Sequence, residues 1–140
     1  SRTLSAISAT RGMTVGGIAT GDPYLEQRYR MPLHGRTYNV TYSFHEGSGK
    51  IASVEINRGA RTLTLSVETP QASRLIMAIQ KPLFDYTIVG NTTQGVELYV
   101  LADGNDTPFT QLIDFKKNLV TYIVNIEKGT SQVTLGGRVQ

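Results

Sequence analysis

Apolar and polar residues alternate along most of the chain from residue 37 onward. In the stretch "TYNVTYSF", Tyr38, Val40, Tyr42 and Phe44 fall on one face, and the residues between them are polar. A period of two is typical of a β-strand that buries one face and exposes the other. The same pattern predicts three further strands with inward apolar side chains: "IASVEI" (Ala52, Val54, Ile56), "RTLTLSVE" (Leu63, Leu65, Val67) and "LVTYIVNIEKG" (Val120, Tyr122, Val124, Ile126).

Turn sequences separate these strands. "HEGSGK" and "NRGA" contain the glycines typical of turns, and Pro70 and Pro82 bound a segment, "RLIMAIQ", that is apolar on both faces. A strand of that kind is expected at a central or inter-sheet position. We expect the connection "KPLFDYTIVGNTTQG" to be irregular, with Leu83, Phe84 and Ile88 packed under the sheet edge.

Three more strands are predicted in "VELYVLA", "TPFTQLIDF" and "TSQVTLGGRV". About seven or eight strands at spacings of about ten residues predict an all-β fold, an immunoglobulin-like antiparallel β-sandwich. The one candidate helix is "DPYLEQRYR", where Pro23 follows a capping Asp22. The sequence leaves open whether that turn or two of helix forms.

The first 35 residues do not keep a single parity of apolar positions, and glycines at 16, 17 and 21 interrupt them. We therefore divide the chain into two parts. Residues 1–20 are an N-terminal extension, a candidate donor strand with a glycine-rich hinge. Residues 21–140 are the β-sandwich domain.

Composition narrows the possible classes of protein. A chain of 140 residues fits one domain, and it has no cysteine for a disulfide or a thiolate site. Its net charge of +3 is scattered except at Arg28/Arg30 and Lys116-Lys117, so we expect no nucleic-acid partner. No run approaches the roughly 18 apolar residues of a membrane span. Because the sequence opens at Ser1 without a basic-then-apolar leader, we expect an extracellular protein whose signal peptide has been removed before Ser1.

No catalytic constellation is visible. The two histidines, His34 and His45, lie in predicted loops without a serine elbow or a paired carboxylate nearby. The acidic residues mostly occupy outward strand positions or loops, although a glycosidase-type pair is not ruled out by sequence. We expect no enzyme activity and no cofactor.

The loop "DGND" at residues 103–106 has two possible readings. A calcium site needs six to eight oxygen ligands, and Asp103, Asn105 and Asp106 supply about half of them. Asp-Gly between two apolar runs is a strong signal for a hairpin turn. We predict the turn and no metal site, while the sequence does not decide whether Asp103 and Asp106 bind a metal.

Three sequons provide candidate sites for N-linked glycans. They begin at Asn39, Asn91 and Asn105, and each has a threonine two positions later. Chance alone gives roughly one such match in a chain like this. We expect N-linked glycans at these positions, and the alternative is an unmodified polar surface.

The N-terminal extension has the composition of a strand that completes another sheet. "RTLSAISATRGMTV" is rich in serine, threonine and alternating small or apolar side chains, and it contains no acidic residue. An open sheet edge invites such a strand from another chain. The candidate assembly residues are Thr3, Leu4, Ala6, Ile7, Ala9, Met13 and Val15. The segment can pair with its own domain or with a neighbouring copy, and the sequence leaves both open.

From about residue 36, the order of the motifs resembles a β-sandwich domain of secreted and surface proteins of archaea, especially ammonia-oxidising ones. The segments that carry this resemblance are "YNVTYSF", "KIASVEI", "LTLSVETP", "LIMAIQKPLFDY", "VELYVLADGNDTPF" and "LVTYIVNIEKGTSQVTLGG", over about three quarters of the chain. The chain departs from that family in having no sorting tail after Gln140, and residues 1–35 match none of its motifs. The resemblance implies a surface location and a non-catalytic sandwich, but no functional residues.

A looser resemblance is to subunits of archaeal extracellular filaments, in which a sandwich that lacks one strand receives an N-terminal strand from its neighbour. We therefore expect a homopolymer on the cell surface, formed by donor-strand complementation. The alternative is a monomeric module that binds a polysaccharide or an envelope component through the loop "YLEQRYRMPLHGR". There Tyr24, Tyr29, Arg28 and Arg30 are candidates to stack on a sugar.

Overall fold

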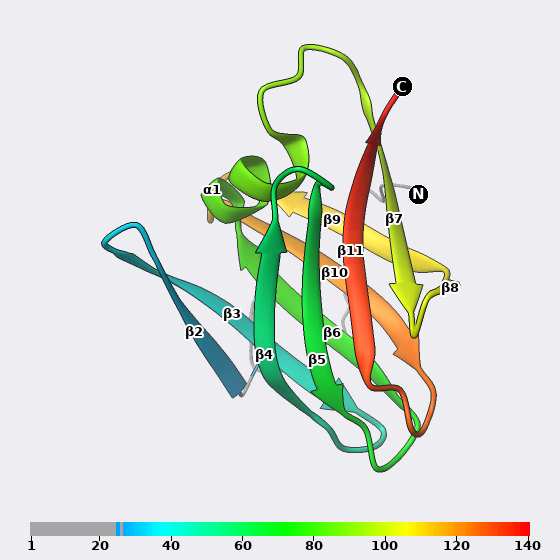
Figure 1. The fold of residues 1–140 in the computed structure, drawn as a ribbon. Coiled ribbons are helices and arrows are strands. Elements are labelled where there is room, and N and C mark those ends of the chain that lie inside the picture. The colour runs from blue at the N-terminus through cyan, green and yellow to red at the C-terminus, as the bar shows by residue number, and fades with distance from the viewer. Residues whose placement is uncertain (1–24, 26) are drawn as a thin grey trace.

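Two antiparallel sheets face each other and enclose the core (Figure 1). The computed structural model describes residue 25 and residues 27–140. The first sheet has the strand order β2 (Gln27–Leu33), β3 (Arg36–His45), β6 (Ser73–Gln80), β10 (Leu119–Ile126) and β9 (Phe109–Asp114). The second has the order β4 (Lys50–Asn57), β5 (Thr62–Glu68), β11 (Gln132–Val139), β7 (Val96–Ala102) and β8 (Asn105–Asp106). The predicted immunoglobulin-like β-sandwich is thus confirmed.

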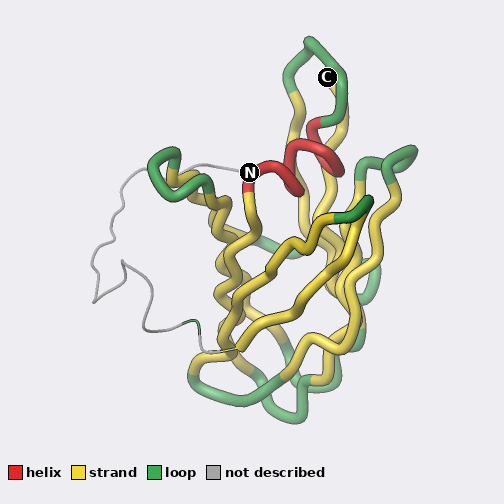
Figure 2. The backbone as a smooth tube through the Cα atoms, turned by 90° about the vertical axis from the view of Figure 1, so that its left-hand side faces the viewer, coloured by secondary structure: helices red, strands yellow, loops and turns green. Residues whose placement is uncertain are grey.

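Two short helical segments cover one end of the sandwich (Figure 2). They are α1 (Lys81–Phe84) and a π-helical turn, η1 (Asp85–Val89), and they follow β6 directly. Arg61 ties this end to the second sheet, because its guanidinium donates hydrogen bonds to the carbonyls of Ile88 and Val89. No helix in the described part of the chain is long and apolar enough to cross a membrane.

The inward apolar side chains of both sheets meet between the layers, as the alternation predicts. Strand β6 lies in the middle of the first sheet between β3 and β10, which confirms the central position expected for "RLIMAIQ". Leu83, Phe84 and Ile88 are buried, as expected. The fully buried side chains that fill the core include Val40, Leu63, Leu65, Leu75, Met77, Ile79, Val100, Val120, Tyr122 and Leu135.

Two local expectations were wrong, and the helix that the sequence left open is not formed by the described residues. Within the segment 22–30, the residues from Gln27 form strand β2 instead of a helix, because Tyr29 and Met31 alternate and pair with Val40 and Tyr38 of β3. The connection after β6 is helical at residues 81–89. Ala52 is exposed, because the pairing of β4 with β5 shifts by one residue between Ile51 and Ser53.

Candidate functional site

The two lateral sides of the sandwich differ in how they are closed. On one side, β3 continues into β4, and the hydroxyl of Tyr42 accepts a hydrogen bond from the backbone N–H of Ile51 at 3.0 Å. The amide of Gln27 adds a bond to the carbonyl of Gly49. On the other side, β7 and β9 belong to different sheets, and only the short strand β8 and its loop lie between them along the chain. We call the edges of β7 and β9 the open side.

The edge of β7 has backbone groups without a strand beside them. Strand β8 pairs only with Leu101 and Ala102, and the N–H of Thr107 donates to the carbonyl of Val100. Hydrogen-bonding direction alternates along an antiparallel strand, so the backbone groups of Leu98 and Val96 point to the same side as that carbonyl. Within residues 27–140, no strand pairs with them there.

The four lateral edges differ in the features that normally discourage pairing with another chain. Charged side chains, proline and bulges protect edge strands. Strand β2 carries Arg28, Arg30 and Pro32, and β4 carries a bulge as well as two charges, Lys50 and Glu55. Strand β7 has one charge, Glu97, and β9 has only its last residue, Asp114. The open side is therefore the less protected one.

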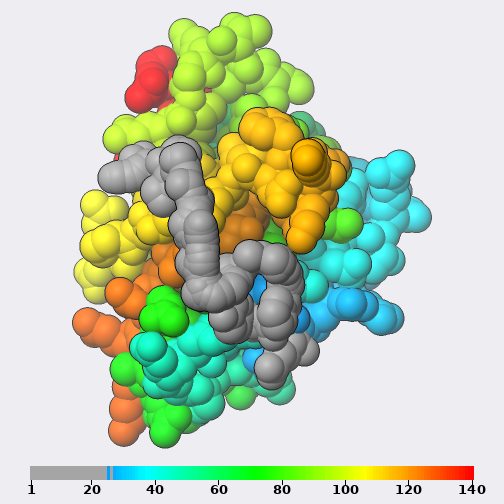
Figure 3. All heavy atoms as spheres, turned by 180° about the vertical axis from the view of Figure 1, so that it is seen from behind, coloured from blue at the N-terminus to red at the C-terminus, as the bar shows by residue number. Residues whose placement is uncertain are grey.

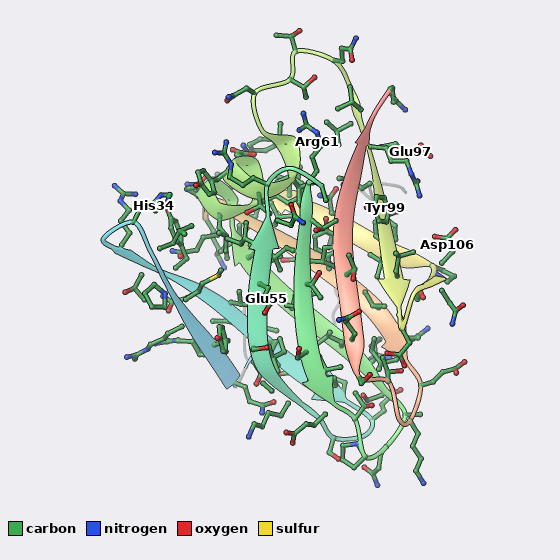
Figure 4. The ribbon with its side chains drawn as sticks, viewed as in Figure 1. His34, Glu55, Arg61, Glu97, Tyr99 and Asp106 are labelled. Carbon is green, nitrogen blue, oxygen red and sulfur yellow. The ribbon has the colours of Figure 1, made fainter. Side chains whose placement is uncertain are left out.

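Apolar side chains continue from the core to this open side. Val96 and Leu98 share the parity of the buried Val100, and both are half-buried against the core. On β9, Phe109 packs partly on the core, and Ile113 is 37 % exposed. Figure 4 shows Glu97 and Tyr99 on β7 and Asp106 on β8 along the same side of the molecule. A strand with alternating apolar side chains would extend the core at this place.

Two buried polar side chains, Gln111 and Tyr122, point into the core from the strands next to the open side. Gln111 of β9 pairs in register with Tyr122 of β10, and they are 4 % and 0 % exposed. Neither the Gln111 Nε2 nor the Tyr122 hydroxyl has a hydrogen-bond partner in the structure. Burial away from water raises the pKa of Tyr122, so its hydroxyl keeps its proton and remains a donor.

Asp103 and Gly104 form the predicted turn between β7 and β8. Both have positive φ, 49° and 84°, and Ala102 pairs with Asn105 across them, which describes a two-residue hairpin loop. The Asp103 carboxylate accepts hydrogen bonds from the Ser131 N–H and hydroxyl, each at 3.1 Å, and from the Gln132 N–H at 2.9 Å. These bonds lower its pKa below the ordinary value of 3.8. Its oxygens therefore hold the start of β11.

A shallow hollow lies next to this turn, between β8 and the end of β10. Four of its lining residues are acidic, but Glu46 is paired with Arg74 at 3.3 Å and Asp103 is engaged by Ser131 and Gln132. The remaining two are Asp106 and Glu127. Among residues 27–140, no group of three or more His, Asp or Glu side chains is placed to hold a metal ion.

The histidines do not share a site. His34 lies in the turn before β3, where its ring packs edge-on against Tyr86 at 5.7 Å, and His45 ends the same strand. A ten-residue strand separates the two by about 30 Å. His34 marks the tip of the β2–β3 hairpin in Figure 4, on the opposite side of the view from Glu97 and Tyr99 of β7.

The predicted sugar-binding residues are not on one surface. Tyr29 pairs with Val40 and packs partly on the core, whereas Arg28 and Arg30 are on the opposite face of β2. Tyr24 lies outside the described residues. The described members of that set therefore do not combine an aromatic ring with the two arginines.

The three sequon asparagines differ in exposure. Asn91, in the loop before β7, and Asn105, in β8, are exposed. Asn39 is half-buried within β3, and its backbone N–H donates to the Gln80 side chain at 2.8 Å. The two loop sequons are the more accessible sites.

The predicted assembly residues Thr3, Leu4, Ala6, Ile7, Ala9, Met13 and Val15 all lie outside the described residues. The surface that could receive them was expected in general terms, but its residues were not identified from sequence. A usable signal was present, since "VELYVLA" and "FTQLID" contain one charge each and no proline, whereas β2 and β4 contain two charges each.

Comparison with protein-family models, with curated proteins and with solved structures found no match for this chain.

Proposed function

We propose that this protein is a structural subunit of an extracellular filament, on an archaeal cell surface. In this proposal, residues 1–15 of one copy add a strand to the open side of the next copy. Such a contact joins two different surfaces, so it repeats head to tail and extends without closing. The observation that carries the proposal is the unprotected edge of β7 at Val96 and Leu98, beside apolar side chains that reach the surface.

Several properties of the segment 1–15 suit that edge. It has no acidic residue and no proline, and its serine and threonine content favours an extended conformation. Leu4, Ile7 and Val15 are of a size to lie beside Leu98, while Ala6 and Ala9 fit shallower positions. An added strand gains main-chain hydrogen bonds, and its alternate side chains give specificity.

The length of chain before β2 is sufficient for exchange between copies. Twenty-four residues precede Leu25, and an extended chain spans about 3.3 Å per residue, roughly 80 Å in all. The described chain begins at β2, which is the edge of the first sheet opposite to β9. A five-stranded sheet is only about 20 Å wide. The segment therefore has ample length to leave its own sandwich and reach another.

The absence of cysteine is compatible with an extracellular location, because secreted proteins can fold without disulfides. The exposed sequons at Asn91 and Asn105 support it more directly, because glycans attach to surface asparagines of secreted proteins. The location and the glycans are part of the proposal.

The test compares the full chain with a chain that lacks residues 1–15. We expect the full chain to form filaments in negative-stain micrographs and to sediment as large species, and the shortened chain to remain a folded monomer. A full-length chain in which Leu4 and Ile7 are both changed to Asp serves as a matched control, since its length is unchanged. It should also fail to assemble. Filaments that persist after the deletion would contradict the proposal.

A further inference from the structure

The buried pair Gln111 and Tyr122 has no partner in a core where nearly every buried polar group is normally satisfied. An unpartnered polar atom in the interior lowers stability, because it has lost its hydrogen bonds to water. The two side chains are neighbours across β9 and β10 and point inward from the open edge of the first sheet. Their position suggests a ligand that enters from the open side.

The surroundings of the pair leave few other partners. The ring of Phe109 lies 5.8 Å from that of Tyr122, tilted by 31°, and Tyr122 pairs with Met77 on its other side. These neighbours are aromatic or apolar and offer no strong acceptor. The amide nitrogen can only donate, and the phenol hydroxyl can donate as well as accept, so one acceptor oxygen between them would satisfy both groups.

The positions of β7 and β9 indicate where that oxygen comes from. Strand β9 is the edge of the first sheet, and β7 lies at the edge of the second except where β8 pairs with Leu101 and Ala102. A strand added to β7 therefore lies across from β9. Its inward side chains would then point toward the Gln111 and Tyr122 side chains. In the segment 1–15, serine and threonine hydroxyls recur among the apolar residues, at positions 1, 3, 5, 8, 10 and 14.

We propose that Gln111 and Tyr122 form the polar contact of the open side with the incoming strand. Their side chains donate hydrogen bonds to a serine or threonine hydroxyl in residues 1–15 of a second copy. This inference rests on the proposed function, and it specifies which residues recognise the incoming strand. A hydroxyl at the correct inward position gives one register of the strand an advantage over the others, which apolar contacts alone distinguish poorly.

The test uses full-length chains carrying Tyr122→Phe or Gln111→Met, with Tyr42→Phe as the matched control. Tyr42 is also a buried tyrosine, 3 % exposed, but its hydroxyl already has a partner in Ile51. We measure the concentration at which filaments form, and the urea midpoint of each chain below that concentration. Losing one such hydrogen bond should raise the threshold about tenfold.

For Tyr122→Phe and Gln111→Met, the threshold should rise while the urea midpoint of the unassembled chain stays the same or increases. Tyr42→Phe should lower the midpoint in the unassembled chain. The inference is wrong if both open-side variants assemble at the wild-type threshold, or if they lose as much unassembled stability as Tyr42→Phe, which would indicate an internal partner such as a bound water molecule. Assembly that survives deletion of residues 1–15 instead overturns the proposed function, and this inference with it.

Discussion

The carboxylate of Asp103 links two turns that are distant in sequence. It belongs to the β7–β8 turn, and it accepts hydrogen bonds from Ser131 and Gln132 at the beginning of β11. The Asp103 backbone N–H donates in turn to the Gln132 carbonyl at 2.8 Å. The side chain therefore stabilises the turn that positions β8. Strand β8 pairs with Leu101 and Ala102, and the unpaired edge of β7 ends there. An acidic residue in a polar loop has a structural role here.

Changing Asp103 to Asn should destabilise the protein at neutral pH by about 1 kcal/mol, because an amide oxygen accepts the same hydrogen bonds without the carboxylate charge, at an exposed site. The pKa of Asp103 is lowered in the folded state, so its contribution is fully present above the unfolded value near 3.8. It disappears as the pH falls through the lower folded-state pKa. Urea denaturation from pH 7 down to about pH 2 should therefore show the wild type and variant converging.

Asp106→Asn is the matched control for this experiment, since Asp106 is exposed in the same hairpin. We expect a change of less than about 0.5 kcal/mol for this control at any pH. A constant difference between Asp103→Asn and the wild type across the whole pH range would contradict the assigned role of the Asp103 charge.

Glycan occupancy should follow the exposure of the three asparagines. We expect peptides with Asn91 and Asn105 to carry added sugar mass in material isolated from the producing cell surface, and the peptide with Asn39 to be mostly unmodified. The reason is that Asn39 is half-buried within the paired strand β3, so its side chain is less accessible than those of the exposed Asn91 and Asn105. Mass spectrometry of proteolytic peptides measures this directly. Dominant occupancy at Asn39 would contradict the argument.

At the level of elements, the strands with strict alternation were the predictable ones. Strands β3, β5 and β10 lie where the pattern placed them, because each buries one face along its length. Strand β2 was missed because Asp22 and Pro23 resemble a helix start, although Tyr29, Met31 and Leu33 alternate. The bulge at Ala52 depends on the partner strand β5, so the sequence of β4 alone does not reveal it.

The candidate site was less predictable than the strands. Which strands become edges is decided by the order of the whole sheet, and that order is not encoded in any local pattern. The sequence shows that β7 and β9 contain one charge each. This low charge matters for strand pairing only because both strands lie at the open side, which the sequence does not show. The unpartnered state of Gln111 and Tyr122 is likewise a tertiary property.

The edge of β7 should lose its capacity to pair when a charge points inward from it. Leu98→Lys places an ammonium group beside the core at the unpaired edge, a feature that discourages strand addition. We expect assembly to weaken by more than about tenfold while the fold remains, because Leu98 is only half-buried and lysine can extend to solvent. Sedimentation velocity gives the assembled fraction, and circular dichroism reports the fold.

Leu101→Lys is the matched control, since Leu101 lies on the same strand with the opposite side-chain parity and its backbone faces β11. It should assemble as the wild type does. Equal loss of assembly in both variants would mean that general surface charge, and not the edge at Leu98, controls the process.

The two lateral sides of the whole molecule differ, as the proposed open assembly requires. One lateral side is closed by the Tyr42–Ile51 hydrogen bond and by protected edges, and the other ends in the less protected strands β7 and β9. Seen from behind, the turn that joins β9 to β10 projects from the surface next to the β2–β3 hairpin (Figure 3). In the proposed assembly, the open side and the N-terminal segment would give each subunit one contact of each kind. Such subunits form linear polymers.

Cross-linking with engineered cysteines tests this account most directly, because the natural chain contains none. Full-length chains with a cysteine at Leu4, Ile7 or Ala9 are mixed with chains carrying Leu98→Cys, and Ala52→Cys on β4 serves as the control partner. A disulfide forms only where the two Cα atoms lie within about 7 Å. We predict that at least one N-terminal position gives a covalent pair of chains with Leu98→Cys, and that none does with Ala52→Cys. A second sample uses chains that carry both cysteines. If disulfides form only within single chains of that sample, and none joins two chains in the mixture, the segment completes its own sandwich and the proposed polymer is wrong.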